Sequence, residues 1–124
     1  MKQAYTDYLR DILAAIDKAE LFLTGVSEDE FKANDEKVFA VVHALEIIGE
    51  AARAIPDDAR ARYATVPWRE VAGMRDKLIH AYFVVDLKRV WETVKRDLPV
   101  LRESISKILA EELSKSQDDE HAAR

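Results

Sequence analysis

Residues 38–55 read Val-Phe-Ala-Val-Val-His-Ala-Leu-Glu-Ile-Ile-Gly-Glu-Ala-Ala-Arg-Ala-Ile, and this stretch decides the fold class. Its apolar residues recur at three- and four-residue steps, which is the spacing of one face of an α-helix. Additional apolar residues broaden that face, so we expect this helix to be buried on much of its circumference. Pro56 follows directly and ends the helix, because proline cannot continue the backbone hydrogen bonding.

The same periodicity appears on the N-terminal side. Residues 5–23 predict a first amphipathic helix, and Gly25 stands where a helix C-cap would. Ser27 and Glu30 have the spacing of a capping box, which begins a short helix holding Phe31. Asn34 or Asp35 would end that short helix and cap the helix described above.

On the C-terminal side we expect a short polar turn or helix over residues 57–63 and a helix from about Trp68 to Tyr82. Asp86 is placed to cap a last long helix, whose apolar residues are spaced alternately by four and three. Pro99 lies inside this helix and should bend it, because the proline ring displaces the carbonyl of Lys95.

Four or five helices with short links predict an all-α, antiparallel bundle. No alternating strand pattern persists, and glycine and proline number three each. The expected division is a helical bundle domain over residues 1–113 and a polar, disordered tail over residues 114–124.

Composition agrees with a single domain. The chain has 124 residues, of which 48% are apolar, and that is enough for a core without disulfides or metal. It contains no cysteine, so a cytoplasmic location is expected. No apolar run approaches the ~20 residues that a membrane span needs, and no association with a membrane is expected.

The net charge of −5 is unevenly distributed along the chain. Residues 66–96 contain seven basic and four acidic side chains, a net charge of +3, so the remainder carries −8. A basic region permits a local phosphate site, whereas the acidic remainder would weaken non-specific coating of nucleic acid. Taken by itself, this region would be read as solvated helix faces.

The basic region contains Gly-Met-Arg-Asp-Lys-Leu-Ile-His-Ala-Tyr at residues 73–82. Arginine is a permanent cation whose planar fork fits a phosphate, and histidine exchanges protons near neutral pH. Arg75 and His80 together suit phosphodiester cleavage without a metal ion or cofactor. In an unbroken helix their side chains would project about 140° apart, whereas Asp76 would share a face with His80 and Tyr82 one with Arg75.

That split projection leaves two arrangements. Either the helix unwinds near His80, or the site is completed across a symmetric interface between two copies. Non-catalytic roles are also open: Arg75 could pair with Glu46 or Glu50, His80 could be an ordinary core or surface histidine, and Tyr82 a core aromatic.

One polar stripe runs along the helix over residues 38–55, at His43, Glu46, Glu50 and Arg53. It could line a cleft or face water. A metal site on this stripe is not expected, since a Glu-x-x-His pair from a second helix and any cysteine are both absent.

The sequence resembles the HepT-like branch of the HEPN family, whose signature is an arginine, four to six residues, and a histidine, followed by a tyrosine two residues later. Arg75, His80 and Tyr82 match it. The resemblance covers most of residues 5–105. Besides the signature, it rests on residues 44–52, 67–74, 85–87 and 90–91.

This resemblance implies a two-fold homodimer and an endoribonuclease, the toxin of a bacterial toxin–antitoxin pair. His80 would then accept the proton of the RNA 2′-hydroxyl, Arg75 would stabilise charge on the phosphate, and Asp76 could orient the imidazole. The resemblance further implies a partner, a minimal nucleotidyltransferase, that silences the toxin by transferring AMP to Tyr82.

Two other interpretations stay open. The chain could be a non-catalytic helical partner, or nucleotide-presenting subunit, of a nucleotidyltransferase. It could also be a plain dimerisation bundle, in which Arg75 and His80 matter for nothing beyond stability.

Overall fold

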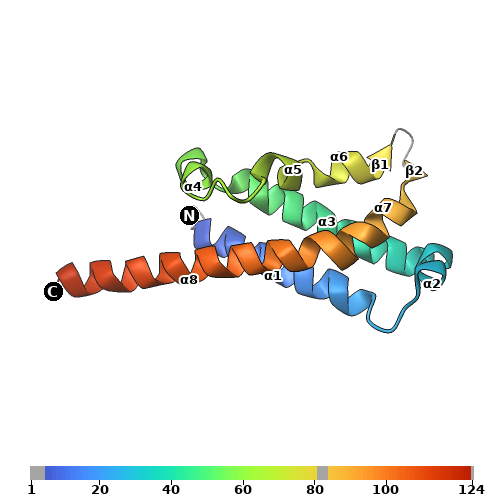
Figure 1. The fold of residues 1–124 in the computed structure, drawn as a ribbon, viewed down its shortest axis with the longest axis horizontal. Helices are drawn as coiled ribbons and strands as arrows, with labels where there is room; N and C mark the ends of the chain where they lie inside the picture. The colour runs from blue at the N-terminus through green and yellow to red at the C-terminus, as the bar shows by residue number, and fades with distance from the viewer. Residues whose placement is uncertain (1–4, 81–83, 124) are drawn as a thin grey trace.

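The computed structural model describes residues 5–80 and 84–123. Three long helices dominate it, namely α1 (Tyr5–Phe22), α3 (Asp35–Ala54) and α8 (Leu98–Ala123). Figure 1 shows α8 running along the long axis beside α1, with α3 behind them and a series of shorter elements lying over α3. The predicted all-α bundle is confirmed.

Shorter elements connect the long helices. They are α2 (Glu28–Ala33), α4 (Asp57–Arg62), α5 (Trp68–Ala72), α6 (Met74–Leu78), β1 (Ile79–His80), β2 (Val84–Val85) and α7 (Leu87–Glu92). A π-helical turn, Thr93–Asp97, joins α7 to α8. Within the described ranges no helix is long and apolar enough to cross a lipid bilayer.

The predicted helix caps around α2 are confirmed. The Ser27 hydroxyl accepts a hydrogen bond from the Glu30 amide at 3.1 Å, and the Asn34 side chain accepts one from the Lys37 amide at 3.0 Å. These bonds satisfy N–H groups in the first turns of α2 and α3 that no helical carbonyl can reach. Gly25 has φ +74°, a conformation that side chains disfavour, and it turns the chain after α1.

The core lies between α1, α3 and the last helix. It contains the apolar residues that the periodicity selected, including Leu9, Ile12, Ile16, Val41, Leu45, Ile48, Ala52, Val94, Leu98, Leu101 and Ile105. Phe31 of α2 is fully buried, and its ring lies 5.9 Å from that of Trp91 in α7. The short helix α2 therefore anchors the N-terminal half of the chain to α7.

A π-helical turn, Thr93–Asp97, directly precedes the stretch that holds Pro99, and the bend predicted at Pro99 stays a prediction. Pro99 has no N–H to donate to the carbonyl of Lys95, four residues earlier. Just before it, the Leu98 amide donates to the Thr93 carbonyl, five residues back, which is the π-helical pattern. The extra residue in this turn changes which side chains α7 and α8 present to the rest of the bundle.

The segment from Ser114, expected to be a disordered tail, is helical as far as Ala123. The expectation rested on its polar composition, but several of its residue types form helices readily without packing. The division of the chain into a domain and a tail stays a prediction.

A polar cluster ties the far end of the bundle together. The Tyr63 hydroxyl, after α4, donates to the Glu112 carboxylate on α8, and the Lys115 ammonium lies 3.3 Å from the same hydroxyl. Burial and the hydrogen bond to Glu112 raise the pKa of Tyr63 to about 12. These contacts hold α4 against α8, at the end opposite β1 and β2 (Figure 1).

The anchoring role of Phe31 can be tested against Phe39, a phenylalanine on α3 that is 77% exposed. Phe31→Ala should lower the free energy of unfolding by roughly 3–5 kcal/mol, because it removes a fully buried ring and leaves a cavity. Phe39→Ala should change it by less than about 0.5 kcal/mol. Equilibrium denaturation in urea measures both, and equal losses would contradict this account of the core.

Candidate functional site

The stretch that carries Arg75 and His80 is not one helix. α5 ends at Ala72, Gly73 follows with φ −91° and ψ 8°, and α6 ends at Leu78. The prediction of a helix from Trp68 to Tyr82 was therefore wrong. The residue types favour a helix, but the chain turns at Gly73 to follow α3 and leaves the helical conformation before His80.

After α6 the chain forms a small antiparallel hairpin. Ile79 pairs with Val85 and His80 with Val84, and the Asp86 amide donates to the Leu78 carbonyl at 2.9 Å. The first of the two arrangements, a helix that unwinds near His80, is thus the one seen in the backbone. The structure describes the backbone of His80 but not its side chain.

The end of α6 removes two geometric expectations. The 140° projection between Arg75 and His80 no longer applies, and neither does the shared helix face of Asp76 and His80. Asp76 is exposed on α6. Tyr82 lies outside the described residues, so its expected alignment with Arg75 stays a prediction.

Arg75 lies against α3. Its Nε atom is 3.3 Å from Oε1 of Glu46, and the two side chains are 46% and 33% exposed. The structure thus realises the pairing with Glu46 that the sequence left open. Since Nε carries only one of the five guanidinium N–H groups, the two terminal nitrogens still offer their donors. Among the described residues no carboxylate forms an ion pair with them.

Gly49, one turn after Glu46, lets α5 approach α3 closely. A Cβ atom at Gly49 would lie 3.1 Å from the carbonyl oxygen of Ala72, at the end of α5. Arg53, a further turn along, donates from a terminal nitrogen to that same carbonyl at 3.1 Å. Three positions on one face of α3 therefore fix where α5 ends and where Arg75 begins.

Sequence reasoning had placed Glu46, Glu50 and Arg53 on one stripe, but not their separate roles. Glu50 and His43 are exposed, and among the described side chains neither makes an ion pair. The contact of Arg53 with the Ala72 carbonyl and the close approach at Gly49 were missed. A glycine in the middle of an otherwise apolar helix is a signal that could have indicated such an approach.

No group of three or more metal-binding side chains is found in the part of the chain that the structure describes. The site as described consists of one half-exposed arginine held by a glutamate, followed within five residues by a histidine at the start of a hairpin. A half-exposed guanidinium is suited to bind a phosphate or another oxyanion.

The family model for "Ribonuclease HepT-like" matches residues 12–108 of this chain. That range includes α3, the segment around Arg75, the hairpin and α7. The chain therefore belongs to the HepT-like ribonuclease family, as the signature of Arg75, His80 and Tyr82 had indicated.

Two relatives align with this chain over most of their own length. A protein of Thermococcus cleftensis described as "Probable ribonuclease HepT" is 47% identical over 108 residues, covering 87% of this chain and 98% of the relative. A protein of Methanocaldococcus jannaschii that carries a provisional RNase name is 44% identical over 102 residues, covering 82% of this chain and 88% of the relative. No solved structure matches the chain significantly.

The close approach at Gly49 predicts a specific response to a larger side chain. Gly49→Val should push the Ala72 carbonyl away and lower the free energy of unfolding by about 1–3 kcal/mol, as overpacking does. Ala72 ends α5, shortly before Arg75 in α6. Displacing its carbonyl should therefore speed the exchange of the α6 amides with solvent, relative to the parent protein, more than that of the α1 amides.

Ala54→Val, at the exposed end of the same helix, is the matched control and should leave both quantities near those of the parent. Hydrogen exchange followed by mass spectrometry gives the comparison. Unchanged exchange in α6 of the Gly49→Val protein would show that α3 does not position this segment.

Proposed function

We propose that this chain is an endoribonuclease that cleaves RNA without a metal ion, using Arg75 and His80. The observation that carries the proposal is the Arg75–Glu46 pair, which holds a half-exposed guanidinium five residues before the histidine. Membership of a family named for ribonucleases supports RNA as the substrate.

RNA supplies its own nucleophile, so the protein needs a base, an acid and a cation. His80, with a reference pKa near 6.5, accepts the proton of the 2′-hydroxyl as this oxygen attacks the adjacent phosphorus. The P–O5′ bond then breaks, and the products carry a 2′,3′-cyclic phosphate and a 5′-hydroxyl. Arg75 stabilises the negative charge that develops on the non-bridging oxygens.

Glu46 contributes by orientation. It lies 3.3 Å from Nε of Arg75, so the guanidinium is held through one nitrogen, and both terminal nitrogens keep their donors for a bidentate contact with phosphate. The pair is too exposed to matter much for stability, since exposed ion pairs contribute about 0–1 kcal/mol. Its value in this scheme is the fixed direction of the fork.

The leaving 5′-oxygen also needs an acid that protonates it. In the proposed scheme it is His80 of a second copy, so that two motifs face each other in a two-fold homodimer. Asp76 keeps a proposed role in orienting the imidazole, although the helix end removes its geometric basis. Sedimentation showing a monomer at micromolar concentration would rule out this composite site.

The biological role proposed here is that of a toxin in a toxin–antitoxin pair. Its partner would be a minimal nucleotidyltransferase that transfers AMP from ATP to the hydroxyl of Tyr82, with release of pyrophosphate. The added phosphate would bring negative charge and bulk to the signature, where the RNA phosphate must bind beside Arg75. The match of Tyr82 to the signature supports this step.

The rival proposal is a non-catalytic helical partner of the same nucleotidyltransferase. It shares the fold and the signature but predicts no RNA cleavage. The half-exposed guanidinium of Arg75 favours the nuclease, because its two terminal nitrogens keep donors that a substrate phosphate can use.

Cleavage is tested directly by incubating the protein with RNA and excess chelator. We expect products with 2′,3′-cyclic phosphate ends, and His80→Ala should lower the rate at least 100-fold, because general base catalysis contributes roughly that much. Arg75→Lys should also lower the rate strongly, since lysine keeps the charge but loses the fork.

Glu46→Gln should slow cleavage about ten-fold through loss of orientation, whereas Glu36→Gln, at the exposed start of the same helix, should cut like the parent. Thermal melting controls for folding. A His80→Ala protein that is folded and cuts at the parent rate would exclude this mechanism.

The regulatory role of Tyr82 makes a separate prediction. Incubation with ATP and the nucleotidyltransferase should add about 329 Da per AMP unit to the peptide that contains Tyr82, a mass set by the formula of AMP less water. Tyr82→Phe should abolish this addition and retain RNA cleavage, because the phenol moves no proton in the scheme.

Tyr63→Phe is the matched control and should still be modified, since Tyr63 follows α4, which lies at the end of the bundle opposite β1 and β2. AMP found on another residue, or loss of cleavage in a folded Tyr82→Phe protein, would overturn the separation between catalytic pair and regulatory tyrosine.

A further inference from the structure

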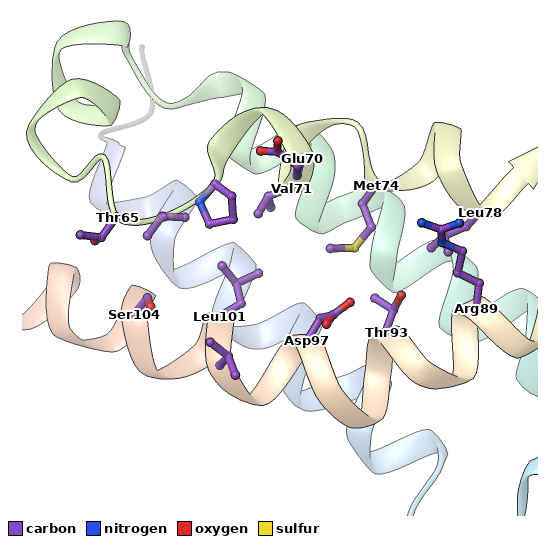
Figure 2. A pocket seen from close by; sticks show the side chains of 13 residues that line it. Thr65, Glu70, Val71, Met74, Leu78, Arg89, Thr93, Asp97, Leu101 and Ser104 are labelled. Carbon is purple, nitrogen blue, oxygen red and sulfur yellow. The ribbon is translucent and has the colours of Figure 1, made fainter.

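A cavity of about 360 Å³ lies between the α5–α6 segment and the last helix. Figure 2 shows it from the side, with Val71, Met74 and Leu78 above and Arg89, Thr93, Asp97 and Leu101 below. Its volume is in the range typical of sites for small organic ligands. It lies on the side of α6 that faces the last helix, whereas Arg75, the next residue after Met74, pairs with Glu46 of α3.

One wall of the cavity is largely apolar, since Val71, Met74 and Leu78 line it together with one charged residue, Glu70. The thioether of Met74 projects into the space in Figure 2. Methionine sulfur makes favourable contacts with aromatic rings, and aliphatic side chains pack well on their faces. This wall therefore suits a flat aromatic ligand.

The opposite wall carries a row of three polar side chains at four-residue spacing, Arg89, Thr93 and Asp97. Thr93 is only 6% exposed, which is unusual for a polar side chain, and it lines the cavity from the π-helical turn. In Figure 2 the Asp97 carboxylate points toward Met74, and the Arg89 guanidinium extends toward Leu78. Neither charged group forms an ion pair within the described part of the chain.

Along this row the Asp97 carboxylate accepts hydrogen bonds, the Thr93 hydroxyl can donate or accept, and the Arg89 guanidinium donates. A ligand that fits it presents donors at one end and acceptors at the other. The edge of guanine has this order: its N2 amino group and N1–H donate, and O6 and N7 accept. An arginine commonly recognises O6 and N7 together. Uracil has no amino group, and the single amino group of adenine lies between two acceptors.

Cytosine also has a donor at one end and acceptors at the other, but it is smaller. Arg89 and Asp97 are eight residues apart, which corresponds to roughly 12 Å along a helix. A purine, with the two side chains reaching inward, spans this distance better than a single six-membered ring.

We propose that this cavity binds a guanine base, and that the base belongs to the RNA substrate. Met74 lines the cavity, and the next residue, Arg75, is the arginine proposed to bind phosphate from another side of α6. A base bound in the cavity would therefore fix the position of its nucleotide relative to this arginine. The assignment to RNA rests on the proposed function. The assignment of the cavity to guanine does not.

The chain contains two methionines, Met1 and Met74, so methyl labelling with carbon-13 gives an isolated signal from the cavity. Met74→Leu identifies it. Titration with 5′-GMP should shift the Met74 methyl signal upfield in a saturable way, through the ring current of the base, and leave that of Met1 unchanged. AMP, CMP and UMP should bind at least ten-fold more weakly.

Inosine monophosphate lacks the 2-amino group and tests the contact with Asp97. It should bind the parent protein about ten-fold more weakly than GMP, which is within the range for one bidentate contact. Asp97→Asn should weaken GMP binding to the level of inosine monophosphate, because the amide cannot accept two hydrogen bonds from one edge. Asp29→Asn, on the exposed face of α2, is the matched control and should bind GMP like the parent.

A last comparison separates RNA from a free nucleotide. Fully 2′-O-methylated UUGU, which cannot be cleaved by 2′-hydroxyl attack, should shift the Met74 signal at a lower concentration than GMP, and UUUU should not shift it. A shift by GMP but not by UUGU would overturn the assignment to RNA.

No shift with either ligand would overturn the guanine site. The measurement needs no cleavage, so its failure is distinguishable from failure of the nuclease proposal, which the cleavage assay tests.

Discussion

The close approach of α5 to α3 is the constraint on which the site depends. Helices of five residues are far too short to be stable alone, so α5 and α6 take their positions from the surface on which they lie. That surface is one face of α3. Gly49 lets the Ala72 carbonyl approach, Arg53 binds the carbonyl, and Glu46 receives Arg75. The conformation of the segment around Arg75 is thus a property of α3 as much as of that segment itself.

This dependence explains how much could be predicted from sequence. Helix ends set by local chemistry were predicted correctly, because Ser27, Asn34 and Asp86 each bond to an amide three residues away. The core residues were also predicted correctly, because the three- and four-residue spacing of apolar side chains follows from the geometry of the helix itself. The break at Gly73 and the two-residue strands could not be found in this way. The break at Gly73 is caused by contact with α3, and the strands form by pairing across a hairpin. Both involve contacts between residues that are distant in sequence, and local periodicity carries no information on such contacts.

The features of the site also differ in whether the sequence could predict them. Arg75 and His80 were recognised from residue types and family resemblance, and the pairing of Arg75 with Glu46 was one of two options that the sequence left open. The cavity behind α6 was not anticipated at all. It arises where the π-helical turn brings Thr93 and Asp97 to face Met74, and neither the turn nor the facing wall is visible in a pattern of apolar residues.

The ends of the chain also have a practical meaning. α1 begins, and α8 terminates, at the end of the bundle away from β1 and β2, as Figure 1 shows. An additional domain or an affinity label joined at either terminus would therefore extend away from the signature hairpin. The bundle can be tethered to a surface, or fused to another protein, with its hairpin end still open to macromolecules in solution.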